Sequence, residues 1–251
     1  MSDFWISCET MQEIAPDYVF LKLFGPLHLA VTAIFILIIV AGMYFYKKLD
    51  DGGRQKFLNI LTVLLVLNEV SKHIILLATG QWGVEQIPLH LCRINIFVCL
   101  WHTIKRDEIS AEILYAVCAP GALVALLMPT WNNIPLWNAF SINSNSVHVM
   151  LLMYPLLLIA GGFRPSVKRL PKVSLVLICE AVPIFFINKL LDTNFFYING
   201  TENNPLLIFL AGIFGEELYI LGLPVILAFV WAAMYLPWYL AEKKEQKTQK
   251  V

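Results

Sequence analysis

The stretch PLHLCRIN, residues 88–95, contains a histidine, a cysteine and an arginine within four consecutive positions. A thiol becomes a nucleophile when a histidine accepts its proton, and an arginine can hold a phosphate or a developing oxyanion. His90 and Cys92 are two residues apart, which separates them by about 200° around a regular helix. They cannot form one nucleophile–base pair there, so a histidine that serves Cys92 must come from another segment, with His148 or His73 as candidates.

Other ionisable residues in apolar segments follow helical spacing. Glu69 precedes Lys72 and His73 by three and four positions, so the three share a helix face and Glu69 can neutralise Lys72. His90 and Arg93 share a face in the same way. An ionised group at the centre of a bilayer costs about 2.5–3.5 kcal/mol. We therefore expect these groups to pair, to line water or to lie near an interface.

The composition indicates a membrane protein. Of the 251 residues, 59% are hydrophobic and 14% are charged, against about 25% charged in soluble domains. The 18 basic and 18 acidic residues balance, which argues against a surface for nucleic acid. The five cysteines form no CxxC pair, which argues against a thiolate zinc site or a disulfide scaffold. We expect no metal ion and no cofactor.

Long apolar blocks predict an all-α bundle of transmembrane helices. A span needs about 20 apolar residues, and we expect a single transmembrane domain over residues 1–251. The block at 206–214 is too short to cross, so it is either an interfacial or re-entrant piece or the start of the last helix. The seven predicted spans cover residues 27–46, 57–79, 88–104, 110–128, 146–163, 173–191 and 215–238.

The distribution of lysine and arginine predicts the orientation. Fourteen basic residues lie between helices one and two, three and four, and five and six, and after helix seven, against Lys22 alone on the other side. Cytoplasmic loops carry the excess of such residues. We therefore expect residues 1–25 outside, the basic tail 240–251 in the cytoplasm, and a multi-pass protein of the plasma (cytoplasmic) membrane.

This topology gathers polar residues toward the outer ends of the helices. Lys72 and His73 are near the outer end of the second helix, His148 opens the fifth and Glu217 opens the seventh. We infer a polar pocket that faces the outer leaflet or the exterior. The candidate catalytic residues are His90, Cys92 and His148. The candidate substrate-binding residues are Glu69, Lys72, His73, Arg93, Asn95, Asn194 and Glu217.

Three motifs resemble the YwaF family of bacterial integral membrane proteins. They are PLHLC at 88–92, HVMLLMYP at 148–155 and DTNFFY at 192–197, and the likeness covers most of the chain from the second helix onward. Eukaryotic relatives of that family are reported as cysteine-dependent acyltransferases that move acyl chains onto lyso-ether phospholipids. The resemblance implies an intramembrane acyl-transfer enzyme whose partner is a membrane phospholipid or lysophospholipid.

The chain departs from those relatives at the nucleophile. They carry Pro-Cys-His in a central helix, whereas Leu89 follows the proline here, and Cys92 lies three residues on, about 4.5 Å deeper. In one version of the chemistry Cys92 is the nucleophile. In the other, His90 or His148 is a general base that activates the lysolipid hydroxyl directly. Candidates to hold the phosphate or oxyanion are Lys72, Arg93 and Asn95.

Two other classes of function fit the same pattern. Seven spans with the N-terminus outside is also the topology of receptors and opsin-like proteins, and a discontinuous helix near residues 212–215 would favour a transporter. The last helix has no lysine for a retinal Schiff base, and no inverted repeat is visible. In a scaffold without chemistry, the polar groups would only stabilise helix packing.

Overall fold

The computed structural model describes residues 4–201 and 204–248, and the regular structure in that part of the chain is entirely helical. The all-α fold and the seven apolar spans expected from the sequence are confirmed. The direction in which the chain crosses the membrane stays a prediction. The seven helical segments long and apolar enough to cross are Pro26–Lys48, Asp51–Ala78, Val84–Lys105, Glu108–Leu127, Ala139–Ala160, Val167–Leu191 and Tyr219–Gln246.

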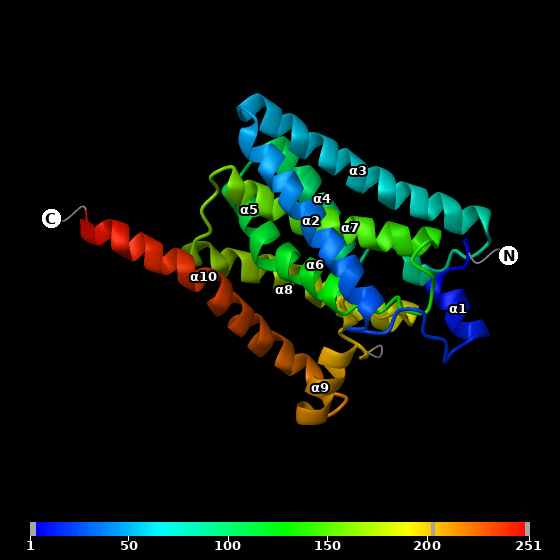
Figure 1. The fold of residues 1–251 in the computed structure, drawn as a ribbon. Helices are drawn as coiled ribbons and strands as arrows, with labels where there is room; N and C mark the ends of the chain where they lie inside the picture. Colours follow the sequence, from blue (N-terminus) through cyan, green and yellow to red (C-terminus); the bar gives the residue numbers. More distant parts are fainter. Residues whose placement is uncertain (1–3, 202–203, 249–251) are drawn as a thin grey trace.

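The helices pack into a bundle with α7 at its centre (Figure 1). The α-helices are α1 (Cys8–Ile14), α2 (Pro26–Lys48), α3 (Asp51–Ala78), α4 (Leu91–Lys105), α5 (Glu108–Ile113), α6 (Ala119–Leu127), α7 (Ala139–Ala160), α8 (Leu170–Leu191), α9 (Pro205–Phe214) and α10 (Gly222–Thr248). The short helical turns are η1 (Val84–Gln86), the π-helical η2 (Leu114–Cys118), η3 (Val167–Arg169), η4 (Phe195–Tyr197) and η5 (Tyr219–Leu221).

The main core forms where α7 packs between α2, α3, α4 and α6. Leu151, Tyr154 and Leu157 of α7 are fully buried, and they lie in one cluster with Leu65 of α3 and Cys99 of α4. Lipid tails are as apolar as these side chains, so the cluster stabilises the bundle through close packing rather than through exclusion of water. α7 is therefore a fixed centre against which polar side chains on its neighbours can be positioned.

Proline explains how α10 attaches to this core. In a regular helix the Ala116 carbonyl would accept from residue 120, but Pro120 has no N–H. The indole of Trp231 in α10 donates to the Ala116 oxygen instead, at 2.8 Å. In return, the Tyr115 hydroxyl donates to the Met234 carbonyl at 2.8 Å. A side chain of α10 thus donates to a backbone carbonyl of η2, and a side chain of η2 donates to a backbone carbonyl of α10.

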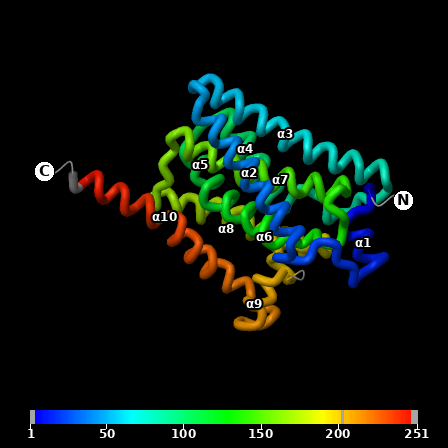
Figure 2. The backbone as a smooth tube through the Cα atoms, viewed as in Figure 1, coloured from blue at the N-terminus to red at the C-terminus, as the bar shows by residue number. Residues whose placement is uncertain are grey.

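The basic segments of the chain gather at one end of the bundle. The α2–α3 turn, the start of α5 and the last turns of α10 lie on the side opposite to α1 (Figure 2). Buried Glu112 holds this end together, because it accepts from the Tyr235 hydroxyl, from the Ser166 amide at 3.2 Å and from Arg169 at 2.8 Å. We call this the basic end and the opposite one the α1 end.

The N-terminal segment covers the α1 end. The Ser7 amide donates to the Gln81 side chain at 2.8 Å, and the Cys8 thiol donates to the Asn133 side chain at 2.9 Å. Cys8 also packs in one buried cluster with Leu76 of α3 and Phe140 of α7. The segment therefore lies over the ends of the two helices that carry most of the polar side chains described below.

Several helix starts differ from the predictions, and those of α7 and α4 affect the candidate site. α7 begins at Ala139 instead of 146, because the Asn138 side chain caps it by accepting from the Phe140 amide at 2.8 Å. His148 therefore lies in the third turn of α7 and does not open the helix. α4 begins at Leu91, with His90 as its extended N-cap residue, so the predicted helix from 88 is too long at its start.

The segment 206–214 forms a separate helix. α9 ends at Phe214 and is followed by Gly215, whose φ of +86° favours glycine, and the chain then turns back into η5 and α10. Glu217 lies exposed in this turn, so the prediction that it opens the last helix is wrong. The α9–α10 hairpin lies at the opposite edge of the bundle from α3 (Figure 1).

Candidate active site

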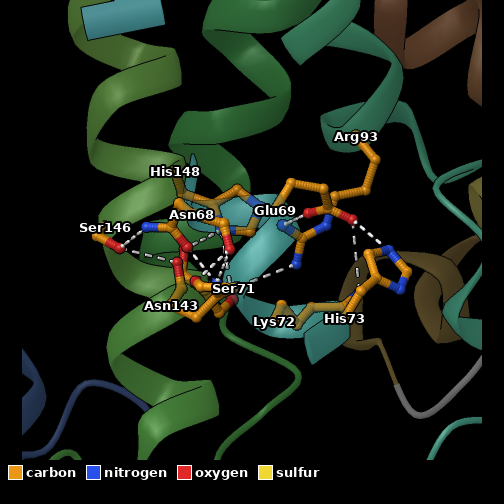
Figure 3. A network of polar contacts seen from close by, with 10 residues as sticks. Asn68, Glu69, Ser71, Lys72, His73, Arg93, Asn143, Ser146 and His148 are labelled. Carbon is orange, nitrogen blue, oxygen red and sulfur yellow. Dashed lines mark hydrogen bonds and ion pairs between the residues drawn. The ribbon is translucent and has the colours of Figure 1, made fainter. Parts of the chain in front are cut away.

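A buried carboxylate of α3 joins three basic side chains near the α1 end. Glu69 accepts from the Arg93 guanidinium of α4, lies 3.1 Å from the His73 Nε2 atom and 3.8 Å from the Lys72 ammonium nitrogen. Figure 3 shows Glu69 between Arg93 and His73. Lys72 and Arg93 are only 4% and 5% exposed, so neither charge is in contact with bulk water. The predicted pairing within α3 is thus extended by an ion pair between helices.

His73 is held in one tautomer by a neighbouring loop. The Trp82 indole N–H, which can only donate, lies 3.2 Å from the His73 Nδ1 atom. Nδ1 therefore accepts, and the proton of the neutral ring is on Nε2, where it donates to Glu69. With Glu69, Lys72 and Arg93 ionised, one negative and two positive charges give the cluster a net charge of +1.

Helix α7 completes the network with uncharged groups. The Asn143 amide donates to the Asn68 backbone oxygen at 2.7 Å, and the Asn143 side-chain oxygen accepts from Arg93 at 3.5 Å. The Asn68 amide donates to the Ser146 hydroxyl at 2.6 Å (Figure 3). Asn143 and Ser146 were not predicted from the sequence. They link α3, α4 and α7 at one depth, which fixes the height of these helices relative to one another.

Cys92 of α4 and His148 of α7 meet beside this network. The two side chains lie close enough to interact with one another. The His148 Nδ1 atom lies 2.8 Å from the Ser144 carbonyl oxygen, which can only accept, so Nδ1 carries the proton. The Nε2 atom is then left to accept the proton of the Cys92 thiol. Of the two histidines considered for Cys92, the structure brings His148 to it, whereas His73 is engaged by Glu69 and Trp82.

The first turn of α4 offers backbone donors next to the thiol. Cys92 is the second residue of the helix, and the Arg93 and Ile94 amides both donate to the His90 carbonyl. Within the described ranges, the Leu91 and Cys92 amides have no acceptor. Free amides and the positive end of the helix dipole favour negative charge at this position. The arrangement can stabilise both a thiolate and an oxyanion that forms beside it.

Comparison with known proteins assigns the chain to a family. A family model described as the TMEM164 family matches residues 23–235, which include six complete spans and most of the seventh. The chain belongs to the TMEM164 family. Comparisons with curated proteins and with solved structures find no match.

The assignment to the TMEM164 family corrects the resemblance drawn from the sequence. The motifs at 88–92, 148–155 and 192–197 suggested the bacterial YwaF family, and the matched family model shows this to be wrong. Two of the three motifs still contribute to one site, because Cys92 and His148 come from the first and second. The third motif serves a different purpose in this TMEM164 family member.

The third motif forms a loop that packs on His90. The His90 ring contacts Phe195 edge to face, with ring centroids 5.2 Å apart, and the Tyr197 ring at 5.5 Å. The buried Asn188 side chain accepts from the Phe195 amide at 2.8 Å and donates to its carbonyl at 2.9 Å. Asn194 closes the loop by accepting from the Asn199 amide at 2.9 Å. The loop thereby fixes the residue that caps α4.

Four predicted site residues consequently lie apart from the Glu69 cluster. The prediction that His90 and Arg93 share a helix face is wrong, because His90 precedes the helix and its ring turns to the loop. The Asn95 amide donates to the Leu91 carbonyl of its own helix at 2.8 Å. Asn194 lies in the loop and Glu217 is exposed in the α9–α10 turn.

The remaining cysteines of this TMEM164 family member have structural surroundings. Cys99 is fully buried in the main core. The Cys118 thiol donates to the Leu151 carbonyl at 3.4 Å, whose helical partner is missing because residue 155 is proline. Cys179 is exposed on α8. In residues 4–201 and 204–248, no group of three His, Cys, Asp or Glu side chains is placed to hold a metal ion.

Proposed function

We propose that this protein is an intramembrane enzyme that transfers acyl chains between phospholipids and lysophospholipids through a thioester on Cys92. The observation that carries the proposal is the proximity of Cys92 to His148 at the amino end of α4. A thiol, a histidine of fixed tautomer and free backbone donors are the groups that acyl transfer through a cysteine requires. They lie inside a membrane bundle, where lipid esters are the abundant acyl donors.

In the first half-reaction, His148 Nε2 accepts the thiol proton and the Cys92 sulfur attacks the ester carbonyl of a phospholipid. The Leu91 and Cys92 amides donate to the oxyanion that forms on the carbonyl oxygen. When the ester C–O bond breaks, the leaving oxygen takes the proton back from His148. The products are a thioester on Cys92 and a lysophospholipid.

In the second half-reaction, the hydroxyl of another lysophospholipid attacks the thioester carbonyl. His148 accepts the hydroxyl proton, the C–S bond breaks, and the thiolate recovers the proton. The thiol and the neutral histidine are restored, and no outside oxidant, reductant or cofactor is consumed. A neutral histidine oriented by the Ser144 carbonyl suits this cycle, because it acts alternately as base and acid.

The Glu69 cluster supports a substrate with a phosphate. Its charge of +1 favours an anion, and Lys72 makes no hydrogen bond to any described residue although it is 4% exposed. An ammonium group buried in this way stabilises a bound phosphate through Coulomb attraction in a medium of low dielectric constant. The predicted orientation would place this site toward the outer leaflet of the plasma membrane.

A transporter is the second candidate, and one observation favours it. The chain breaks between α9 and α10 at Gly215, where a discontinuous helix would suit a transport site. However, the two helices fold into a hairpin away from α3, and the polar cluster lies on α3, α4 and α7 (Figure 1). The break and the charged groups therefore do not form one site, which favours the enzyme.

Acyl transfer in lipid nanodiscs tests the proposal. Purified protein would be incubated with a phospholipid carrying a deuterated acyl chain and an unlabelled lysophospholipid, and labelled products would be followed by mass spectrometry. We expect transfer by the wild type and by Cys99→Ala, and none by Cys92→Ala. Transfer that persists in Cys92→Ala and stops in His148→Ala would instead support direct activation of the hydroxyl. No transfer with any donor would contradict the enzyme, and uptake of a polar solute would favour transport.

A further inference from the structure

A hollow on the lipid-facing side of the bundle lies between α4, α5 and α8. Its volume is about 290 Å³. Its walls include Ile94, Phe97 and Val98 of α4 and Ile113 of α5, and Glu180 of α8 also lines it. We call this hollow the α4–α8 groove. It is apolar apart from this carboxyl group and the polar start of α5 at the basic end.

Glu180 differs from the other buried carboxyl groups of the spans. It lies near the middle of the span Val167–Leu191 and is partly buried. Glu69 and Glu112 each have several hydrogen-bond or ion-pair partners. Glu180 has none among the residues that the structure describes. A carboxyl group at this depth without a partner is costly, and such groups in spans normally mark a site of interaction.

The depth of Glu180 decides between occupants of the groove. Phosphate, ester and hydroxyl groups of lipids lie near the membrane surfaces, so a lipid chain in the groove would leave the carboxyl group unpaired. A lysine or arginine of a neighbouring transmembrane helix can reach the same depth and neutralise it. The groove has room for one such side chain between apolar walls, and intramembrane carboxylates and basic residues commonly pair with one another.

A second copy of the chain does not supply this cation. On α8, Lys172 lies eight residues before Glu180 and Lys189 nine residues after it, which is about 12 Å and about 13.5 Å along the helix axis. In two copies with the same orientation, each lysine would therefore differ in depth from Glu180 by that amount. Lys72 and Arg93 are buried and engaged with Glu69. The partner must be a different protein.

We propose that the α4–α8 groove docks a transmembrane helix of another protein, which carries a lysine or arginine near the middle of its span and pairs it with Glu180. The apolar side chains of α4 and α5 pack against the apolar face of that helix, and the ion pair sets its depth. This interaction goes beyond the proposed acyl transfer, because the groove lies on the face of α4 that is turned away from Cys92.

Binding of synthetic transmembrane peptides in nanodiscs tests the docking site. Three peptides of about 20 apolar residues would carry a central lysine, a central leucine, or a lysine moved by two helical turns. Each would carry a fluorophore for energy transfer to the labelled protein. We expect the central-lysine peptide to bind about tenfold more tightly than the other two, and Glu180→Gln to abolish that preference while Glu217→Gln retains it.

Photocross-linking provides a second, independent measurement of peptide binding at the α4–α8 groove. A photoreactive residue beside the central lysine should label α4 or α8 in the wild type and lose that labelling in Glu180→Gln, while the thermal transition of the variant stays unchanged. Equal binding of the lysine and leucine peptides, or a lysine preference that survives Glu180→Gln, would overturn the proposal. A phospholipid that stays bound in the groove in the presence of excess lysine peptide would also overturn it.

Discussion

The His148 Nδ1 atom lies 2.8 Å from the Ser144 carbonyl oxygen, one turn earlier in α7. This contact fixes the proton on Nδ1 and leaves Nε2 as the ring nitrogen that can accept the proton of the Cys92 thiol. Because the orienting group is a neutral carbonyl, nothing at this contact would stabilise a doubly protonated imidazole as a carboxylate does. His148 is thus suited to pass a proton between thiol and substrate within one turnover.

Replacing the two candidate histidines should give opposite results. His148→Ala removes the base, and we expect the rate of acyl transfer to fall about 10²–10⁴-fold. His90→Phe keeps an aromatic ring against Phe195 and Tyr197 and should retain most of the activity. Initial rates in nanodiscs measure both. An inactive His90→Phe beside an active His148→Ala would show that the base is on α4.

Removing the central carboxylate should destabilise the bundle. Glu69→Gln leaves Arg93 and Lys72 buried without a negative partner, and losing one member of a buried ion pair costs about 3–5 kcal/mol. Thermal unfolding in detergent should therefore begin at a clearly lower temperature than in the wild type. Glu217→Gln, in the exposed turn, is the matched control and should unfold as the wild type does. Equal stability of both variants would mean that Glu69 carries no net charge in the folded protein.

The attachment of α10 can be tested with a double-mutant cycle. Trp231→Phe removes the donor to the Ala116 carbonyl and should cost about 1 kcal/mol of unfolding free energy. Pro120→Ala restores a backbone N–H four residues after Ala116. In that background, Trp231→Phe should cost measurably less. Strict additivity of the two substitutions would show that the proline does not create the need for the indole.

Stability at alkaline pH should depend on Cys8. Burial raises the pKa of the Cys8 thiol from 9.0 to about 12, and the neighbouring Glu9 carboxylate adds to the rise. The neutral thiol therefore favours the folded state fully below pH 9, and this contribution is lost as the pH rises from 9 toward 12. The midpoint of thermal unfolding should fall between about pH 8 and about pH 10.5, and fall less in Cys8→Ala. A pH profile unchanged by that substitution would contradict the burial of the thiol.

The spans could be predicted from the sequence because each is a long apolar run, but helix starts could not. Residues 139–146 contain Ser141, Asn143 and Ser144, which lowers their hydropathy below that of a span. In the structure Asn143 bonds to α3 and α4, and the Ser141 and Ser144 hydroxyls have partners within α7. The Asn138 cap is the signal that could have placed the start of α7 correctly.

The site could be predicted only in part. Helix geometry excluded a pairing of His90 with Cys92 and named His148 as one alternative, which the structure brings to the thiol. Spacing along one helix could not reveal the contact between Glu69 and Arg93, because it joins separate helices. The position of His90 depends on a loop more than ninety residues away, held by Asn188. Such contacts come from the packing of the bundle.

Detection of a covalent acyl group on Cys92 tests the central claim most directly. Protein incubated with a deuterated phospholipid would be quenched in acid, digested and analysed by mass spectrometry, with hydroxylamine treatment to cleave thioesters. The proposed function predicts a labelled acyl group on Cys92 that hydroxylamine removes, that disappears when lysophospholipid is added, and that accumulates slowly in His148→Ala. Acyl transfer that proceeds without any such label, or a label on Cys99 instead, would contradict it.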